Sequence, residues 1–252
     1  MELGLFNKRA LVSGGSRGIG KVIARQLARE GVDVVIAARG WPALQATADE
    51  LATATGRRIV PLAADTAQRA SVDQLVAAAV QALGGLDIVV NAAAVPGGSG
   101  SSGALADTDD EDVLSDFNVK VLGYLRVARA AAPHLRAGGA GRIINIGGLA
   151  AFRTGRAPAT LRNVGVSALS KTLADELGPQ GVNVFAVHPG ATRTERTDAA
   201  AAQRAGLANG IGRIVEAEEI ADLVVFLASA RSAALHGASL HAGGGSPGVI
   251  HY

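Results

Sequence analysis

Seven short apolar segments recur along the chain, and longer segments with helical periodicity separate them. Each is a nearly continuous apolar run, which is typical of strands buried on both faces of a parallel sheet. They span residues 9–14, 32–38, 58–65, 86–94, 141–148, 182–190 and 238–245. Strands that alternate with helices in this way predict an α/β fold, in which helices cover both faces of a doubly wound parallel sheet of about seven strands.

The segments between the strands predict how the chain is organised. Apolar residues recur at three- and four-residue steps over 113–135, which predicts one long helix. No internal repeat or linker divides the chain, so we expect a single domain over residues 1–252. Residues of about 190–215 carry no clear strand or helix signal and are predicted to form a substrate lid. The Gly/Ser-rich stretch 96–103 is predicted to be a mobile loop at the carboxyl edge of the sheet.

Composition excludes several classes of protein. The net charge is only +2 and no segment concentrates lysine and arginine, so we expect no nucleic-acid binding. The chain has no cysteine, which excludes disulfides, thiolate catalysis and zinc–sulfur sites and suits a reducing compartment. The N-terminus lacks the features of a signal peptide, and no apolar run approaches the ~18 residues of a membrane helix. We therefore expect a cytoplasmic protein that has no membrane segment and no metal site.

A glycine-rich turn joins the first predicted strand to the first helix. In "LVSGGSRGIG", Gly14, Gly18 and Gly20 are interleaved with Ser16 and Ile19. Glycine lets the backbone approach a pyrophosphate closely, and a helix N-terminus offers free N–H groups and the positive end of the helix dipole. The turn therefore predicts a dinucleotide site in a Rossmann-type fold. A tight turn without a ligand is the alternative.

The end of the second strand indicates which dinucleotide is bound. An acidic residue usually holds the ribose 2′-hydroxyl at this place, but here Ala38 is followed by Arg39. Arg17, within the glycine-rich turn, adds a second guanidinium. Because guanidinium groups bind phosphate through forked, charge-assisted hydrogen bonds, the sequence predicts NADP(H) in preference to NAD(H). Solvated arginines are the alternative.

With these features the chain resembles the classical short-chain dehydrogenase/reductase family over nearly all of its length. The matching motifs are "SGGSRGIG", "VNAAA" at 90–94, "HPGATRT" at 188–194 and "HAGGG" at 241–245, together with Asp65 and Asn118. The resemblance implies an oxidoreductase that acts on carbonyl and alcohol groups. It places Asp65 at the adenine, and Asn91 at the adenine-side ribose or its flanking strand. The further cofactor residues implied are Thr66, Ala92 and Ala93, and, at the nicotinamide end, Pro189, Gly190, Thr192 and Thr194.

The residues that move protons in this family are missing at their expected positions. The family uses a serine, a tyrosine and a lysine, with an asparagine on the long helix. Counting back from the Pro-Gly motif places the tyrosine at Ala159 and the lysine at Asn163. Gly147 and Gly148 stand where the serine would end the fifth strand, with Gly148 at its place. Asn118 alone keeps its residue type and is the predicted catalytic residue.

Realignment does not restore the missing tyrosine and lysine. Tyr124 lies in the middle of the long helix. Tyr252 is the last residue, and it could reach an active site only as a contribution from a neighbouring subunit. Lys171 is eight residues beyond Asn163, about 12 Å along a helix, which is too far to replace the lysine.

Other residues near the expected nicotinamide have ambiguous signals. His188 has a pKa suited to proton transfer, although a locally hydrogen-bonded histidine is the plainer interpretation. Lys120 is expected to lie on a different helix face from Asn118, as a solvated lysine. Five arginines form a candidate anion site or a set of solvated side chains: Arg153, Arg156, Arg162, Arg193 and Arg196.

Three functions are compatible with these residues. The first is an NADP(H)-dependent oxidoreductase with a weakened active site, because a positioned acid or base contributes only ~10²–10⁴ to a rate and hydride transfer belongs to the cofactor. The second is a non-catalytic NADP(H)-binding sensor or oligomer partner, and the third is a lyase or isomerase that uses the fold without redox chemistry. In each case we expect an unknown small-molecule ligand and a homo-oligomer, either a tetramer or a dimer.

Overall fold

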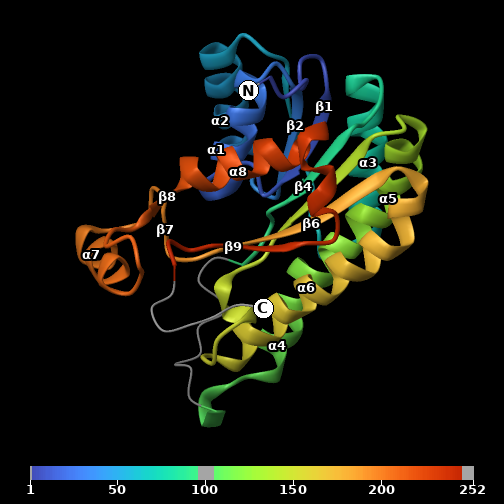
Figure 1. Cartoon of the computed structure of the whole chain (residues 1–252). Coiled ribbons are helices and arrows are strands. Elements are labelled where there is room, and N and C mark those ends of the chain that lie inside the picture. The colour runs from blue at the N-terminus through green and yellow to red at the C-terminus, as the bar shows by residue number, and fades with distance from the viewer. Residues whose placement is uncertain (1, 96–104, 246–252) are drawn as a thin grey trace.

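The computed structural model describes residues 2–95 and 105–245, so the loop predicted at 96–103 and Tyr252 lie outside the described residues. Its centre is a parallel sheet of seven strands in the order β3-β2-β1-β4-β5-β6-β9 (Figure 1). The strands are β1 (Arg9–Ser13), β2 (Asp33–Ala38), β3 (Ile59–Ala63), β4 (Ile88–Asn91), β5 (Gly141–Ile146), β6 (Val182–Pro189) and β9 (Ser239–Ala242). The seven predicted strands and the doubly wound α/β fold are confirmed.

Helices cover both faces of this sheet. One face packs against α1 (Gly18–Arg29), α2 (Trp41–Thr55) and α8 (Ala217–Ala228), and the other against α3 (Arg69–Leu83), α5 (Gly123–Ala137) and α6 (Ala157–Leu177). Successive strand residues serve opposite faces, since Val12 belongs to the first core and Leu11 to the second. Short 3₁₀ turns lie at Leu105–Asp107, Leu149–Ala151, Gly178–Gln180 and Ala230–Leu235.

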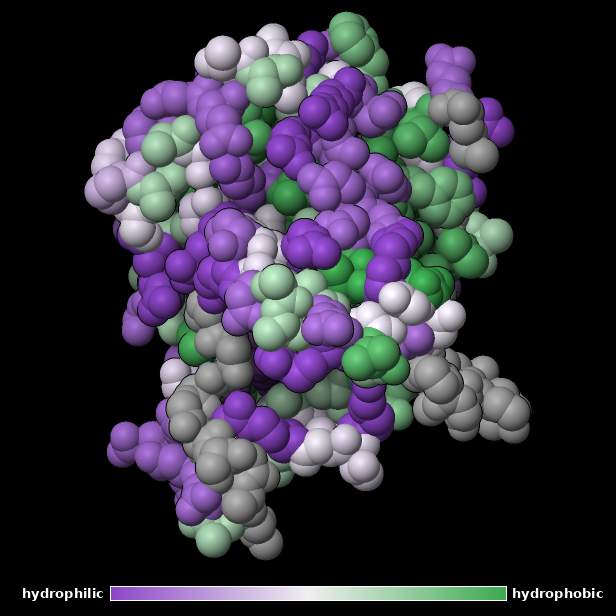
Figure 2. Space-filling view, turned by 90° about the vertical axis from the view of Figure 1, so that its left-hand side faces the viewer, coloured by the Kyte–Doolittle hydropathy of each residue, from purple (hydrophilic) through white to green (hydrophobic). Residues whose placement is uncertain are grey.

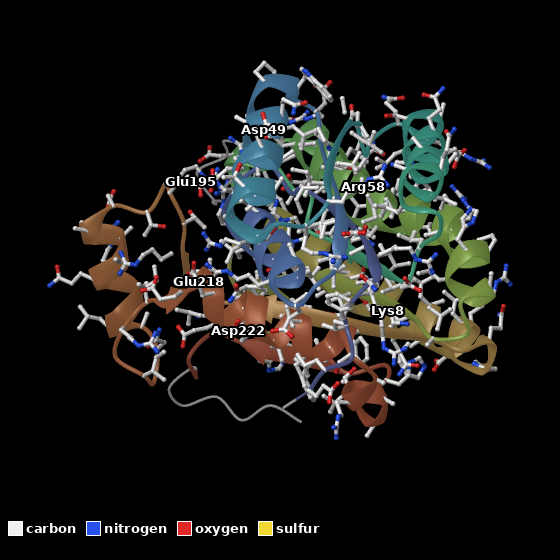
Figure 3. The ribbon with its side chains drawn as sticks, turned by 90° about the horizontal axis from the view of Figure 1, so that it is seen from above. Lys8, Asp49, Arg58, Glu195, Glu218 and Asp222 are labelled. Atoms are coloured by element: carbon white, nitrogen blue, oxygen red, sulfur yellow. The ribbon has the colours of Figure 1, made fainter. Side chains whose placement is uncertain are left out.

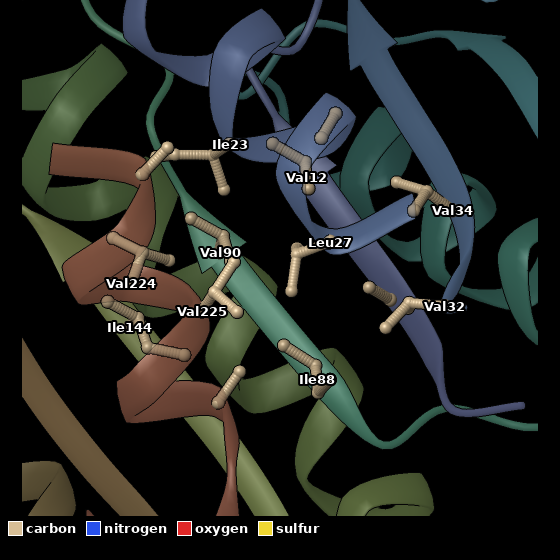
Figure 4. Packing of buried hydrophobic residues seen from close by; sticks show 14 of the residues in the cluster. Val12, Ile23, Leu27, Val32, Val34, Ile88, Val90, Ile144, Val224 and Val225 are labelled. Carbon is tan, nitrogen blue, oxygen red and sulfur yellow. The ribbon is translucent and has the colours of Figure 1, made fainter. Parts of the chain in front are cut away.

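Branched side chains fill the space between the sheet and its first helical layer. Figure 4 shows Val12 and Val90 of the strands with Leu27 of α1 and Val224 of α8, all of which are fully buried. Fully burying a valine or leucine side chain contributes about 1.5–3 kcal/mol, so this layer is strongly stabilised. The packed strands hold the loops at their carboxyl ends in fixed positions.

The predicted long helix is divided by a change in its winding. The structure has α4 (Asp110–Phe117), then a π-helical turn over Asn118–Leu122, and then α5. A π turn takes an extra residue per turn, so it rotates the side chains that follow around the helix axis, and such turns are frequent at functional sites. The three- and four-residue spacing that predicted one continuous helix therefore does not hold across the π-helical turn.

Residues 190–215 contain regular structure that the sequence did not predict. The segment holds β7 (Thr192–Arg193) and α7 (Ala199–Leu207), and β7 pairs in parallel with β8 (Val215–Glu216) as a separate two-stranded sheet. The side chain of Asp198 caps α7 by accepting a hydrogen bond from the Ala201 N–H at 2.7 Å. Figure 1 shows α7 to one side of the main layers. Among the helices described, none is both long and apolar enough to span a membrane.

Candidate functional site

A cleft opens at the carboxyl ends of β1 and β4, where the strand order of the sheet reverses. Ligands bind at such a reversal in open α/β sheets. The volume of the cleft is about 660 Å³. Most of the predicted cofactor residues line it: Gly14, Ser16, Arg17, Gly18, Ile19, Gly20, Arg39, Asp65, Thr66, Ala92, Ala93, Pro189, Gly190 and Thr194. The fold thus brings five separate segments of the sequence to one place.

Three predicted site residues are not part of the cleft lining. Asn91 is fully buried, and its amide donates to Asn145 Oδ1 at 2.9 Å, so it joins β4 to β5 behind the cleft wall. The Thr192 hydroxyl donates to the Gly190 carbonyl at 3.1 Å. Asn118, the predicted catalytic residue, accepts a hydrogen bond from Arg126 Nη2 at 2.8 Å. The side chain of Asn118 is therefore engaged away from the cleft.

The glycine-rich turn packs too tightly for larger residues. A Cβ on Gly14, where φ is +75°, would lie 2.7 Å from the backbone of Ala92, and one on Gly20 would lie 2.3 Å from the Gly14 carbonyl oxygen. Gly18 instead faces open space, because the nearest atom to its added Cβ would be Thr194 Cγ2 at 3.7 Å. The turn combines close internal packing with an accessible backbone at the start of α1.

The N-terminus of α1 already holds a carboxylate. No side chain caps this helix end and no acidic residue lies in its first turn, but the Gly18 N–H donates to Glu195 Oε2 at 3.1 Å. In Figure 3, Glu195 lies beside the N-terminal helices, on the segment that leads to α7. Free N–H groups and the helix dipole make a helix N-terminus a site for anions. Glu195 therefore occupies a position whose N–H groups and dipole suit an anionic group.

Two exposed arginines border the same end of the cleft. Arg17 precedes α1 and Arg39 follows β2, and neither forms an ion pair with any residue that the structure describes. Ala38 stands beside Arg39 at the end of β2, and no carboxylate occupies that position. Hydrophilic residues dominate the face on which α7 lies, with only scattered hydrophobic ones (Figure 2). This end of the cleft presents positive charge to a ligand.

At the opposite end of the cleft, α6 carries the positions where the family's tyrosine and lysine are expected. Ala159 lies in the first turn of α6, and Asn163 is buried one turn later. The Asn163 amide Nδ2 donates to the Ala159 carbonyl at 2.8 Å, which leaves Oδ1 directed at another partner. That partner is Lys120.

Lys120 is buried, so the expectation of a solvated lysine is wrong. Its ammonium donates to Asn163 Oδ1 and to the Gly147 carbonyl, both at 2.9 Å, and the side chain lines the cleft. The pKa of Lys120 is lowered to about 7, chiefly by burial and also by the nearby Arg162, while Asp116 acts in the opposite sense. The π-helical turn explains the error, because it turns Lys120 inward instead of Asn118.

A buried ion pair lies beside Lys120. Arg162 Nη1 donates to Asp116 Oδ2 at 2.8 Å; the Asp116 side chain is almost fully shielded from solvent, and that of Arg162 is 14% exposed. Arg162 is one of the five candidate arginines. It also lines the cleft, so it is more than a solvated side chain. The pair joins α6 to α4 and fixes the charged surroundings of the lysine.

His188 fills the space beside Gly147, the residue before the expected position of the serine. A Cβ on Gly147 would lie 2.3 Å from His188 Nδ1, so a side chain at that position and the present histidine ring exclude one another. His188 Nε2 lies 3.2 Å from Ser167 Oγ, and its Nδ1 lies 3.3 Å from the backbone of Gly148. Burial lowers the pKa of His188 to about 4, so the ring is neutral near pH 7. These local bonds agree with the plainer interpretation of His188.

Tyr124 is also unsuited to proton transfer. Its hydroxyl donates to the Ile146 carbonyl at 3.0 Å, the side chain is fully buried, and burial raises the pKa of the phenol well above its usual value. The sequence predictions missed Lys120 as a site residue, because α-helical counting from Asn118 places it on a different face. The described residues contain no cluster of histidines and carboxylates able to hold a metal ion.

Comparison with known proteins gives consistent matches over the whole chain. The model of a family described as enoyl-(acyl carrier protein) reductase matches residues 14–246. The short-chain reductase protein NovJ of Streptomyces niveus is 34% identical over 94% of this chain and 93% of its own length. Trans-4-hydroxycyclohexanecarboxylate dehydrogenase of Sinomonas cyclohexanicum is 36% identical over 94% of this chain and 92% of its own length.

Solved structures match the fold as closely. The L-sorbose reductase of Gluconobacter frateurii, in complex with NADPH and L-sorbose, superimposes with a TM-score of 0.91 at 28% identity over 99% of this chain and 100% of its own. A short-chain dehydrogenase of Burkholderia cenocepacia in complex with NADP gives a TM-score of 0.86 at 34% identity over 96% of this chain and 98% of its own.

Proposed function

The chain belongs to the short-chain dehydrogenase/reductase family of oxidoreductases, and we propose that it binds NADP(H) and transfers a hydride between that cofactor and a carbonyl or alcohol with an altered set of proton-handling residues. The observation that carries the proposal is the cleft at the strand-order reversal, where the open N-terminus of α1 meets two exposed arginines. When bound, the cofactor supplies the hydride, and the protein supplies the binding groups and the proton.

The residues present fit a dinucleotide pyrophosphate. The Gly18 N–H binds the carboxylate of Glu195, which stands in for a phosphate oxygen at the start of α1. Gly14 lets the turn lie close to the end of β4, and Gly20 lets the start of α1 pack against the Gly14 carbonyl. Ser16, Ala92 and Ala93 form the adjoining walls. The NADPH and NADP complexes of the related L-sorbose reductase and Burkholderia dehydrogenase support the same assignment.

We assign the 2′-phosphate preference to Arg17 and Arg39. Both border the cleft at the end of β2, and Ala38 offers no carboxylate to a 2′-hydroxyl. A 2′-phosphate gives each guanidinium a charge-assisted partner, whereas a 2′-hydroxyl leaves both solvated. NADP(H) is therefore the proposed cofactor in preference to NAD(H).

The altered proton-handling site is the distinctive part of the proposal. Ala159 has no group to exchange a proton, Gly148 has no hydroxyl, and Asn163 carries no charge at neutral pH. Since a positioned acid or base contributes ~10²–10⁴ in rate, a substitute group must be present for efficient turnover. The substrate stays unassigned beyond the class of carbonyl and alcohol compounds.

We further propose that residues 190–215 are the substrate lid of a single domain over 1–252, and that the protein forms a homo-oligomer. Thr194 and Arg196 belong to this segment and line the cleft, which supports a lid. Exposed Leu114, Leu161 and Val164 of the adjoining helices α4 and α6 support an interface between copies of the chain. Multi-angle light scattering is expected to give a dimer or tetramer, and a monomer at all concentrations would contradict the assembly.

Cofactor binding and turnover together test the proposal. We expect calorimetric titration to show tighter binding of NADPH than of NADH, and NADPH to be oxidised with some member of a panel of aldehydes and ketones. Gly14→Ala is expected to lose NADPH binding, because its Cβ would meet the backbone of Ala92 at 2.7 Å. Gly139→Ala is the matched control, since Gly139 has a similar φ of +69°, nothing lies within 4 Å of its added Cβ, and it does not line the cleft. Tight binding without turnover at high enzyme concentration would favour the non-catalytic sensor or oligomer partner, and absence of NADPH binding would contradict both functions.

A further inference from the structure

Two residue types at the cleft have exchanged places relative to the family that the chain resembles. The family pattern calls for an asparagine on the long helix and a lysine on α6. The structure places Lys120 on the wall formed by the long helix and Asn163 on α6, with the ammonium and the amide oxygen 2.9 Å apart. The ammonium at the cleft thus comes from the long helix, and the amide that binds it comes from α6.

The position of Lys120 leaves part of its ammonium free to act. An ammonium has three N–H groups. Two of them are used by Asn163 Oδ1 and the Gly147 carbonyl, and within the described residues no third acceptor is found. Lys120 lines the cleft, so a ligand bound there is the acceptor available to the third N–H.

We propose that Lys120 is a catalytic residue, which holds a proton at Nζ and donates it to the substrate oxygen in place of the absent tyrosine and lysine. The inference rests on the proposed oxidoreductase function. In the reducing direction, the carbonyl carbon accepts the hydride while an N–H bond of Lys120 breaks and an O–H bond forms on the substrate. The products are an alcohol, the oxidised cofactor and a neutral lysine amine, which regains its proton from solvent. In the oxidising direction, the neutral amine accepts the proton of the alcohol.

The two fixed acceptors suit both protonation states of the lysine. After it gives up one proton, a neutral amine keeps two N–H groups, which match the two acceptors at Gly147 and Asn163. The lone pair then points where the third N–H was. The hydrogen bonds that hold Nζ in place are therefore preserved throughout the transfer.

The surroundings of Lys120 allow both its charged and its neutral form to be populated near neutral pH. Asp116 on α4 and Arg162 on α6 act on Lys120 in opposite senses, and the two form an ion pair with each other. His188 on β6 faces the same region as a neutral ring. Burial is the largest influence and lowers the pKa of Lys120 to about 7, which is the range where a general acid–base group works best at neutral pH.

Neither neighbouring candidate competes for this role within the described residues. The Tyr124 hydroxyl donates to the Ile146 carbonyl and its pKa is raised, so it is a poorer acid than a free phenol. The His188 ring is hydrogen-bonded to Ser167 and to the backbone of Gly148, and its lowered pKa keeps it neutral at pH 7, so it has no imidazolium proton to donate.

The test compares Lys120→Met with Lys171→Met, a matched loss of an exposed lysine that forms an ion pair with Asp175. We expect Lys120→Met to bind NADPH with an unchanged cofactor stoichiometry but to lose about 10²–10⁴ in kcat for the best substrate of the panel. Lys171→Met is expected to match the native chain. Lys120→Gln, which keeps an amide donor at the site, serves if the methionine variant does not fold. Retention of native kcat by either folded Lys120 variant would overturn the inference.

A second readout needs no cofactor and no turnover. In the protein without cofactor, NMR titration of the carbon adjacent to Nζ, assigned by its loss in Lys120→Met, is expected to show a midpoint near pH 7. A midpoint at the ordinary value for lysine, 10.5, would overturn the inference. Failure of the native chain to bind NADPH would instead overturn the proposed function, and the inference with it.

Discussion

The ring of His188 occupies the space that a side chain at Gly147 needs. A Cβ built on Gly147 would lie 2.3 Å from His188 Nδ1 and 2.5 Å from Cε1, which is far inside any real contact. The next glycine differs, because a Cβ on Gly148 would lie 3.2 Å from the side chain of Asn163. The absence of a side chain at Gly147, the residue before the serine's expected position, is therefore coupled to the presence of this histidine.

This coupling predicts different outcomes for two serine substitutions. Gly147→Ser is expected to lower the free energy of unfolding by about 1–3 kcal/mol, the usual cost of overpacking a core. Gly148→Ser is expected to cost less, because the Asn163 side chain needs to move only slightly. Urea denaturation measures both, and Gly147→Ser combined with His188→Ala is expected to recover stability relative to the sum of the single changes. Equal costs for the two serines would contradict this account of the cleft.

Glu195 occupies the anion position at the start of α1 and is expected to compete with the cofactor. Removing its charge as Glu195→Gln should tighten NADPH binding, because an anion at a helix N-terminus is worth about 0.3–1 kcal/mol and its displacement no longer opposes binding. The expected change is roughly 2–5-fold in Kd, measured by calorimetry. Asp222→Asn, an exposed carboxylate on α8 that binds Gln26, is the matched control (Figure 3). Unchanged or weaker binding by Glu195→Gln would count against competition at this site.

Arg39 is expected to distinguish the two dinucleotides. Arg39→Ala removes a guanidinium from the end of β2, and a hydrogen bond to a charged group contributes about 1.5–3 kcal/mol. NADPH binding should weaken by roughly 10–100-fold, while NADH binding should change little. Arg58→Ala removes an arginine directly before β3, at the opposite end of the strands from Arg39, and serves as the control. An equal loss for both cofactors would show that Arg39 does not contact the 2′-phosphate.

The lowered pKa of Lys120 predicts a pH-dependent stability. Below about pH 7 both the folded and the unfolded chain hold this proton, and above 10.5 neither does. Between these values the unfolded chain binds the proton and the folded chain does not, so the free energy of unfolding rises with pH across this window. Relative to Lys120→Met, the free energy of unfolding of the native chain should rise by a few kcal/mol from pH 7 towards pH 10.5, at about 1.4 kcal/mol per pH unit. Urea denaturation at several pH values measures the difference, and a constant difference would contradict the shift.

The cofactor half of the cleft could be predicted because its signals are local. Gly14, Gly18 and Gly20 lie within one turn, and Arg39 follows a strand whose end is clear in the sequence. Asn91 shows the limit of such reasoning. Its place in the motif indicates the cofactor region, but whether the amide turns to the cleft or to Asn145 depends on the neighbouring strand, which only the assembled sheet specifies.

Lys120 could not be placed by counting residues. The periodicity of an α-helix assigns Asn118 and Lys120 to different faces, and a charged residue is normally given the solvated one. The π-helical turn over Asn118–Leu122 changes the count, and acceptors from two distant segments, Gly147 and Asn163, stabilise the buried ammonium. Likewise, α7 has only weak apolar periodicity, so its sequence carries no clear helix signal, although Asp198 caps its start.

The central claim is that Lys120 supplies the proton that the family's tyrosine would supply. Its most direct test is the pH dependence of the single-turnover rate of NADPH oxidation with a saturating carbonyl substrate, for the native chain and for Lys120→Met. A general-acid role for Lys120 predicts that the native rate falls as the pH rises through about 7, where the ammonium is lost. The variant is then expected to be slow at every pH and to show no fall in rate near pH 7. A native rate that stays constant from pH 6 to pH 9, or the same step in Lys120→Met, would contradict it.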